Sequence, residues 1–136
     1  MLLNIVTPNK KLIVNEEVCE VMVPANRGEL TVYPGHSPLI TTLEIGVLKY
    51  KKTESDPYSQ FAISWGYCEI SGNEIKILAE KAESSKEIDK SRSEEALKVA
   101  DSKLSNFKEL TIDDISKYTN KLKRAETRIS ISELKK

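Results

Sequence analysis

The sequence predicts an α+β protein in which an N-terminal antiparallel β-sandwich, a flattened barrel of about ten strands, precedes an antiparallel two-helix hairpin. Up to about residue 80, short apolar runs alternate with polar residues and are broken by Gly, Pro and Asn. From Ser84 onward Gly and Pro are absent, and Ala, Glu, Lys, Ser and Leu dominate. The 136 residues, 39% of them hydrophobic, suffice for one core and a small appendage.

The strand pattern occupies nine ranges of the first 80 residues. In "YCEISGNEIKIL" the Ser-Gly-Asn triplet supplies turn residues between two alternating runs, so this segment is the clearest hairpin. Because no helical pattern separates the ranges, we expect them to pair as one antiparallel sandwich. They are 2–7, 12–14, 17–23, 28–32, 39–43, 47–51, 61–64, 66–70 and 74–79.

Two helices follow, and the link "FKEL" is short enough to make them antiparallel. The first should begin after Ser84-Ser85, with Glu87 in its N-terminal turn, and run to about residue 106 with an apolar face of Ile88, Ala96, Val99, Ala100 and Leu104. The second should begin at Thr111, where Thr-Ile-Asp-Asp forms a capping box, with an apolar face of Ile115, Tyr118, Leu122, Ala125 and Ile129.

These features divide the chain into a sandwich domain, 1–83, and a helical domain, 84–136. The helical faces are narrow and poor in large residues, so the hairpin is predicted to dock on the sandwich or to open onto a partner. Charge follows the same division, because residues 1–80 hold 7 basic and 10 acidic side chains whereas residues 81–136 hold 14 and 11.

The second helix is basic. Residues 117–136 contain two acidic residues, Glu126 and Glu133, against seven basic ones, which are Lys117, Lys121, Lys123, Arg124, Arg128, Lys135 and Lys136. Two interpretations stay open, a solvated helix face or a contact with an acidic protein surface or phosphates. Nucleic acid is disfavoured because the helical domain lacks a platform of aromatic and basic residues.

Catalytic and metal chemistry lack the residues they need. His36 is the only histidine, and Cys19 and Cys68, which we expect to be reduced, are too few for a zinc site. The chain also lacks a Gly-x-Ser-x-Gly elbow and a glycine-rich phosphate loop. We therefore expect a non-catalytic protein that requires no cofactor.

The loop "YPGHSPL" accounts for His36 without chemistry. Pro34 sets one backbone angle, Gly35 permits a positive φ, and Pro38 extends Ser37, so the loop is a stiff tip that displays His36. Stiff tips on a β scaffold commonly contact partners. The sequence holds neither a secretory signal nor a run of about 20 apolar residues, so membrane association is expected only through a partner.

At this point the residues resemble a family. "GELTVYPGHSPLITTLEIGVLKY" resembles the signature of the epsilon subunit of the F-type ATP synthase, Gly-x-Leu/Ile-x-Val/Ile-x-Pro-Gly-His-x-Pro-Leu followed by a strand and Gly-x-Leu/Ile. The opening "LNIVTPNKKLIVNEEVCEVMVPANRGEL", the hairpin "SGNEIKILAEKAE" and the helical "RAETRISI" extend the resemblance over nearly the whole chain.

The resemblance implies a small rotor subunit without an active site. Its sandwich would grip the gamma subunit and rest on the c-ring, coupling ion-driven rotation to catalysis on the alpha and beta subunits. Its mobile hairpin would permit turnover when folded and block ATP hydrolysis when extended. The implied location is the cytoplasmic face of a bacterial inner membrane or, alternatively, the stromal face of a chloroplast thylakoid.

The resemblance also assigns contact residues. Arg27, Glu29 and His36 would face the c-ring, and an acidic segment of the beta subunit would meet the basic set of Lys121, Lys123, Arg124 and Arg128. Some bacterial members bind ATP on the folded hairpin, and the corresponding residues here are Ile88, Asp89, Arg92, Arg124 and Arg128. Ser93 and Val99 depart from that pattern, and the lost arginine removes bidentate phosphate binding, so an ATP site would be weak or absent.

Two alternatives remain open. Asp89 and Arg92 fit an ordinary helix N-terminus as well as they fit a nucleotide site. The whole chain also fits a free-standing β-sandwich binding module whose basic tail recruits an unrelated acidic partner.

Overall fold

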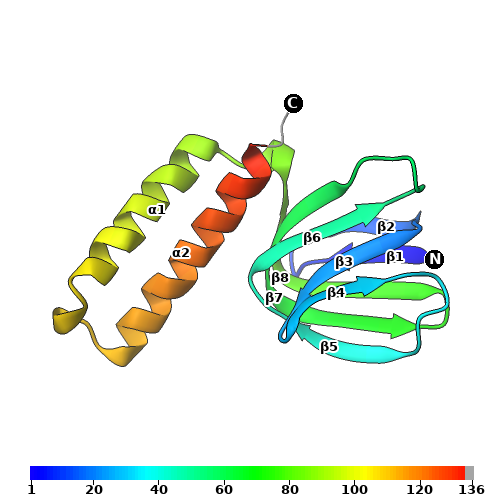
Figure 1. Ribbon diagram of the computed structural model, residues 1–136, viewed down its shortest axis with the longest axis horizontal. Coiled ribbons are helices and arrows are strands. Elements are labelled where there is room, and N and C mark those ends of the chain that lie inside the picture. Colours follow the sequence, from blue (N-terminus) through cyan, green and yellow to red (C-terminus); the bar gives the residue numbers. More distant parts are fainter. Residues whose placement is uncertain (134–136) are drawn as a thin grey trace. The chain divides into compact units, whose positions relative to one another are not determined.

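The computed structural model in Figure 1 describes residues 1–133, apart from the side chain of Phe107. Lys135 and Lys136 of the basic segment lie outside the described residues. The chain divides into two compact units, Met1–Glu83 and Ser84–Lys136. The first is a β-sandwich and the second a helical hairpin, which confirms the predicted fold class.

The sandwich unit contains eight strands rather than about ten. They are β1 (Leu2–Val6), β2 (Lys11–Glu17), β3 (Glu20–Ala25), β4 (Gly28–Val32), β5 (Leu39–Leu43), β6 (Gly46–Lys51), β7 (Ser59–Ser71) and β8 (Glu74–Ser84). The predicted ranges 61–64 and 66–70 are one strand, β7, because Trp65 and Gly66 bend the strand without ending it. Their φ angles are 42° and 154°.

Strand β7 belongs to both layers of the sandwich. Its first half pairs with β6, from Tyr50 opposite Ser59 to Gly46 opposite Ile63, and its second half pairs with β5. One layer is therefore β4-β3-β6 with the start of β7, and the other is β2-β1-β8 with the end of β7 and β5. The bend at Trp65-Gly66 carries the strand from one layer to the other, as a β-bulge does at a barrel corner.

One strand pair differs from the antiparallel expectation. β1 and β8 are parallel, from Leu2 opposite Glu74 to Val6 opposite Leu78. A parallel pair joins segments far apart in the chain, so no local turn signal could reveal it. Between the layers lies a core of branched side chains, and Leu3, Ile5, Leu48, Ile63 and Ile77 are fully buried.

The helical unit contains α1 (Lys90–Ser105) and α2 (Ile112–Ser132), which Figure 1 shows side by side and antiparallel, with short 3-10 turns η1 (Ser85–Glu87) and η2 (Phe107–Glu109). The predicted start of the first helix is wrong. Ser84 and Glu87 form the capping box of η1. The N-cap of α1 is Asp89, five residues after Ser84, and α1 begins at Lys90. The capping box that begins α2 at Thr111 is confirmed.

The predicted apolar face of α2 is confirmed, since all five of its residues are buried or half-buried. That of α1 is wrong in part, because Ala96 and Val99 are exposed, whereas Ser93 and Ala100 are buried. Ser93 tolerates burial because its hydroxyl donates to the Asp89 carbonyl at 2.9 Å. Among the described residues, no helix has the length and apolar character to cross a membrane.

Candidate partner-binding surfaces

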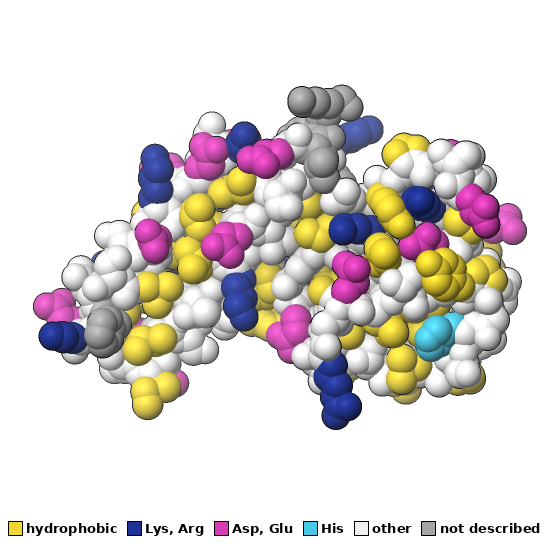
Figure 2. Space-filling view, in the orientation of Figure 1, with side chains coloured by type: hydrophobic (Ala, Val, Ile, Leu, Met, Phe, Trp, Pro, Cys, Tyr) yellow, Lys and Arg dark blue, Asp and Glu magenta, His cyan; other side chains and the backbone are white. Residues whose placement is uncertain are grey.

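The β4–β5 loop holds His36 at the end of a type II turn. The His36 amide donates to the Tyr33 carbonyl at 3.2 Å, and Gly35 has a φ of 87°, as position i+2 of this turn requires. His36 Nδ1 lies 2.7 Å from the Ser37 carbonyl oxygen and donates to it, so Nε2 is the ring nitrogen left for a partner. The side chain is half-buried, and Figure 2 shows it (cyan) reaching the sandwich surface.

Arg27 and Glu29 lie apart from His36. Both are exposed at the β3–β4 hairpin, where Gly28 pairs with Ala25 and Glu29 with Pro24. β4 then runs away from this turn toward the His36 loop, so about 13 Å of extended strand separates Glu29 from the start of that loop. The three residues that the resemblance grouped therefore occupy two ends of one strand.

An apolar groove of about 710 Å³ lies at the bend of β7. It runs from the β1–β2 turn across β8 and β7 to the end of β5, and its apolar lining includes Val6, Pro8, Leu43, Trp65, Tyr67 and Leu78. Gly66 forms part of its wall, where a Cβ atom would stand 1.9 Å from the Leu78 carbonyl oxygen. Only glycine allows β7 and β8 to approach this closely.

Large apolar side chains stand exposed in this groove and, at Ile40, on the same layer outside its lining. Tyr67 and Leu78 are 57% and 51% exposed, and Ile40, on the outer face of neighbouring β5, is 72% exposed. Sequence reasoning missed this surface. The period-two alternation places Ile40 and Leu78 outward, but their apolar character gave no sign that the outward side stays uncovered.

The basic residues of α2 do not share one face. Lys117, Lys121, Arg124 and Arg128 follow the spacing i, i+4, i+7 and i+11, which forms a stripe along one side of a helix. Lys123, which the resemblance included, projects from another side, and Lys117, which it omitted, begins the stripe. We call these four residues the basic stripe.

The two ends of the basic stripe differ in exposure. Lys117 and Lys121 are exposed, and their ammonium groups lie 5.9 Å and 5.5 Å from the centre of the Tyr118 ring. Arg124 and Arg128 are half-buried, and Nε of Arg124 is inaccessible to solvent. The Lys117 end of the stripe thus offers exposed cations, whereas the Arg128 end is partly covered.

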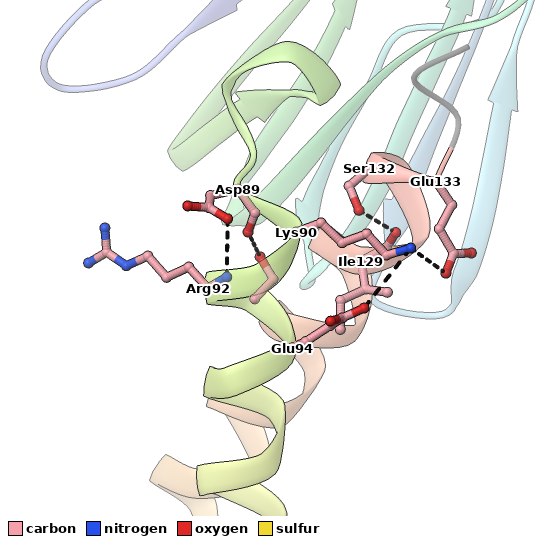
Figure 3. Close-up of polar contacts among 8 residues, drawn as sticks. Asp89, Lys90, Arg92, Glu94, Ile129, Ser132 and Glu133 are labelled. Carbon is pink, nitrogen blue, oxygen red and sulfur yellow. Dashed lines mark hydrogen bonds and ion pairs between the residues drawn. The ribbon is translucent and has the colours of Figure 1, made fainter.

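The residues of the suggested nucleotide site have other roles here. The Asp89 carboxylate caps α1 by accepting from the Arg92 amide at 3.2 Å, and Ile88 is buried. Arg92 is exposed, and Figure 3 shows its guanidinium pointing away from the other labelled side chains. Val99, which stands where ATP-binding members have an arginine, is 54% exposed. With Asp89 engaged and one cation missing, this set fits a triphosphate poorly.

Within residues 1–133, no three His, Cys, Asp or Glu side chains are placed to hold a metal ion. Cys19 and Cys68 are free, and burial of Cys68 raises the pKa of its thiol to about 11, so that it stays protonated and unreactive at neutral pH. The candidate sites described above are three surfaces, namely the groove, the His36 tip and the basic stripe.

Comparison with known proteins gives these surfaces a context. Residues 1–85 match the family model for the ATP synthase delta/epsilon chain β-sandwich domain. The ATP synthase epsilon chain of Bdellovibrio bacteriovorus is 41% identical over 133 residues, covering 98% of this chain and 94% of that one. ATP synthase epsilon chain 1 of Syntrophotalea carbinolica is 39% identical over 133 residues, covering 96% of this chain and 91% of that one.

Solved structures show the same fold at lower identity. A chain in the cryo-EM structure of the Euglena gracilis mitochondrial ATP synthase, with OSCP, F1 and c-ring, superposes with a TM-score of 0.80 at 21% identity, covering 93% of this chain and 78% of that one. A chain in the cryo-EM structure of the Tetrahymena thermophila mitochondrial ATP synthase central stalk and c-ring superposes with a TM-score of 0.65 at 16% identity. The match covers 97% of this chain and 96% of that one. By the family model and these near full-length relatives, the chain belongs to the epsilon-chain family of the ATP synthase.

Proposed function

We propose that this chain is a rotor subunit in the central stalk of an F-type ATP synthase. It couples ion-driven rotation of the c-ring to ATP synthesis on the alpha and beta subunits, has no active site of its own, and inhibits ATP hydrolysis through α1 and α2. The observation that carries the proposal is the exposed apolar groove on a chain of this family. An exposed apolar groove with large side chains on it is typical of a surface that binds another protein.

That partner is the gamma subunit. Ile40, Tyr67 and Leu78 supply the large apolar contacts that central interface residues usually make. Ile40→Asp should weaken binding of purified gamma by about tenfold or more, measured by titration calorimetry. Val14→Asp is the matched control, because Val14 is also exposed, at 58%, but lies on β2 at the far edge of the same layer. Equal loss in both variants contradicts the assignment.

The His36 tip contacts the polar loops of the c-ring. Its type II turn loses little entropy on docking, and the Ser37 carbonyl holds the ring through Nδ1, so Nε2 can hydrogen-bond to a partner. In reconstituted vesicles His36→Ala should lower proton-driven ATP synthesis while gamma binding stays unchanged. Arg27 and Glu29 form a second contact at the opposite end of β4, so Glu29→Gln should act additively with His36→Ala. Unaltered ATP synthesis in the double variant would contradict a functional contact between these residues and the c-ring.

Inhibition of hydrolysis rests on the basic stripe meeting an acidic segment of the beta subunit. Deleting residues 84–136 should raise ATP hydrolysis by the catalytic head of alpha, beta and gamma subunits, and Lys117→Glu with Lys121→Glu should raise it in the full chain. Lys123→Glu reverses one charge on another side of α2 and is the matched control for Lys117→Glu alone. Equal hydrolysis with and without residues 84–136 excludes an inhibitory hairpin.

ATP is at most a weak ligand of the hairpin, because Asp89 is engaged as a helix cap and position 99 carries valine. Equilibrium dialysis of the full chain against labelled ATP tests this, and Arg124→Ala is the control for specific binding. Within the proposal the chain is peripheral to the membrane, held through the complex at the cytoplasmic face of a bacterial inner membrane.

A further inference from the structure

Lys90 joins the two helices at the base of the hairpin, the end where α1 begins and α2 ends. Its Nζ lies 3.7 Å from Oε1 of Glu133, the C-cap residue of α2, and 4.0 Å from Oε1 of Glu94 on its own helix. Figure 3 shows the Lys90 side chain crossing from α1 to the last turn of α2, between the two carboxylates. All three side chains are about half exposed, so the contacts are open to salt.

Each charge of this pair opposes the dipole of its own helix. Lys90 is the first residue of α1, whose first turn holds no acidic residue, and a cation at a helix N-terminus is unfavourable. Glu133 caps α2, whose last turn holds no basic residue, and an anion at a C-terminus is equally unfavourable. The Lys90–Glu94 pair has the less favourable order for an i,i+4 pair.

At the opposite end of the hairpin, where α1 ends and α2 begins, the charges complement the helix dipoles. Lys103 lies in the last turn of α1, and Asp113 and Asp114 lie in the first turn of α2, where each complements the dipole of its helix. Those charges stabilise each helix whether or not the helices touch. Lys90 and Glu133 become favourable only when the base is closed.

We propose that Lys90 and Glu133 form a salt-sensitive clasp that holds the base of the hairpin closed. When the helices separate, each charge faces an unfavourable helix dipole without its partner. The pair therefore stabilises the contact between the two helices and does not stabilise either helix alone. Rising ionic strength therefore weakens the clasp and promotes opening at the base. The clasp is a property of the hairpin and stands whether or not the hairpin inhibits hydrolysis.

Hydrogen exchange in the full, isolated chain tests the clasp through the amides of residues 90–96 and 126–133. An exposed pair of this kind should slow their exchange about twofold to fivefold, and the protection should vanish near 1 M salt, where the Debye length is about 3 Å. Lys90→Glu and Glu133→Lys should each speed exchange by at least the same factor. The double exchange, Lys90→Glu with Glu133→Lys, should restore wild-type protection or exceed it, because both charges then also suit their helices.

A purely helical role predicts a different pattern. Lys90→Glu improves the dipole of α1 and would slow exchange in its first turn if the pair across the base were irrelevant. Lys108→Glu, the same charge change at the exposed tip, should leave the base unchanged. Slower exchange in Lys90→Glu, additive effects of the two single variants, or protection that salt does not reduce would each overturn the clasp.

Discussion

In the sandwich the fully buried side chains are mostly large and branched, such as Leu48, Ile63 and Ile77. In the hairpin the described buried positions within the helices are mostly small, with Ile131 of α2 as the large exception; the small ones are Ser93, Ala100, Ala125 and Ser132. Burying an isoleucine stabilises a fold by about 1.5–3 kcal/mol, and burying an alanine by far less. The two units therefore combine a stiff body with helices whose packing is weak enough to be remodelled.

Backbone geometry shows the same contrast. The sandwich holds Gly66 where no side chain fits, and a single strand that serves both layers. The hairpin depends on local caps at Asp89 and Thr111 and on one exposed ion pair at its base, Lys90 with Glu133. Substitutions should accordingly lower the free energy of unfolding more in the sandwich than in the hairpin.

The largest effect is expected from Gly66→Ala. The new Cβ would meet the Leu78 carbonyl oxygen at 1.9 Å, and φ of 154° is strained for any side chain, so the sandwich should lose about 4 kcal/mol or more. Urea unfolding followed by Trp65 fluorescence measures this loss. Gly72→Ala, with φ of 59° but open space, should cost about 1–2 kcal/mol. Similar losses in both would mean that the approach of β7 to β8 is not tight.

Truncation of a core side chain compares the units directly. Ile77→Ala, at a fully buried position, should lower the free energy of unfolding of the sandwich by about 3–4 kcal/mol. Leu97→Ala, at a half-buried position of α1, should cost the hairpin about 1 kcal/mol. Trp65 fluorescence reports the sandwich and far-UV circular dichroism the helices. A larger loss in the hairpin would reverse the comparison.

A pH dependence should appear in the sandwich through Cys68. Burial raises the pKa of its thiol from 9.0 to about 11, so the folded state keeps the proton that the unfolded chain loses. This contribution is fully present below about pH 9 and is lost as the pH rises through 11, about 2–3 kcal/mol in all. Cys68→Ala should flatten the fall in unfolding free energy over this window, measured by urea unfolding followed by Trp65 fluorescence.

The smallest effect is expected at the cap of α2. Thr111 Oγ1 accepts from the Asp114 amide at 3.1 Å, so Thr111→Ala should cost the hairpin about 1 kcal/mol, seen as earlier thermal loss of helical circular dichroism. Ser116→Ala, at an exposed interior position, is the control and should be neutral or slightly stabilising. An unchanged sandwich in both variants would confirm that the units melt separately.

Much of the candidate site was predictable, and the misses have physical causes. The type II turn at His36 follows from Pro34 and Gly35, and the capping box follows from Thr111 and Asp114. The first helix begins later than predicted because Ser84 and Asp89 are both good caps, and local preference does not choose between them. The groove was missed because the sequence does not show whether another layer covers the outward apolar residues of a strand.

The sequence by itself determined what depends on residues a few positions apart, namely the alternation of the strands, the turn that displays His36, the cap of α2 and the spacing of the basic stripe. The tertiary structure decided what depends on which distant segments meet, namely the parallel pairing of β1 with β8, the passage of β7 between layers, and the contact of Lys90 with Glu133. Local conformational preferences are encoded within one or two turns of chain, whereas long-range pairings are selected by the packing of the whole core.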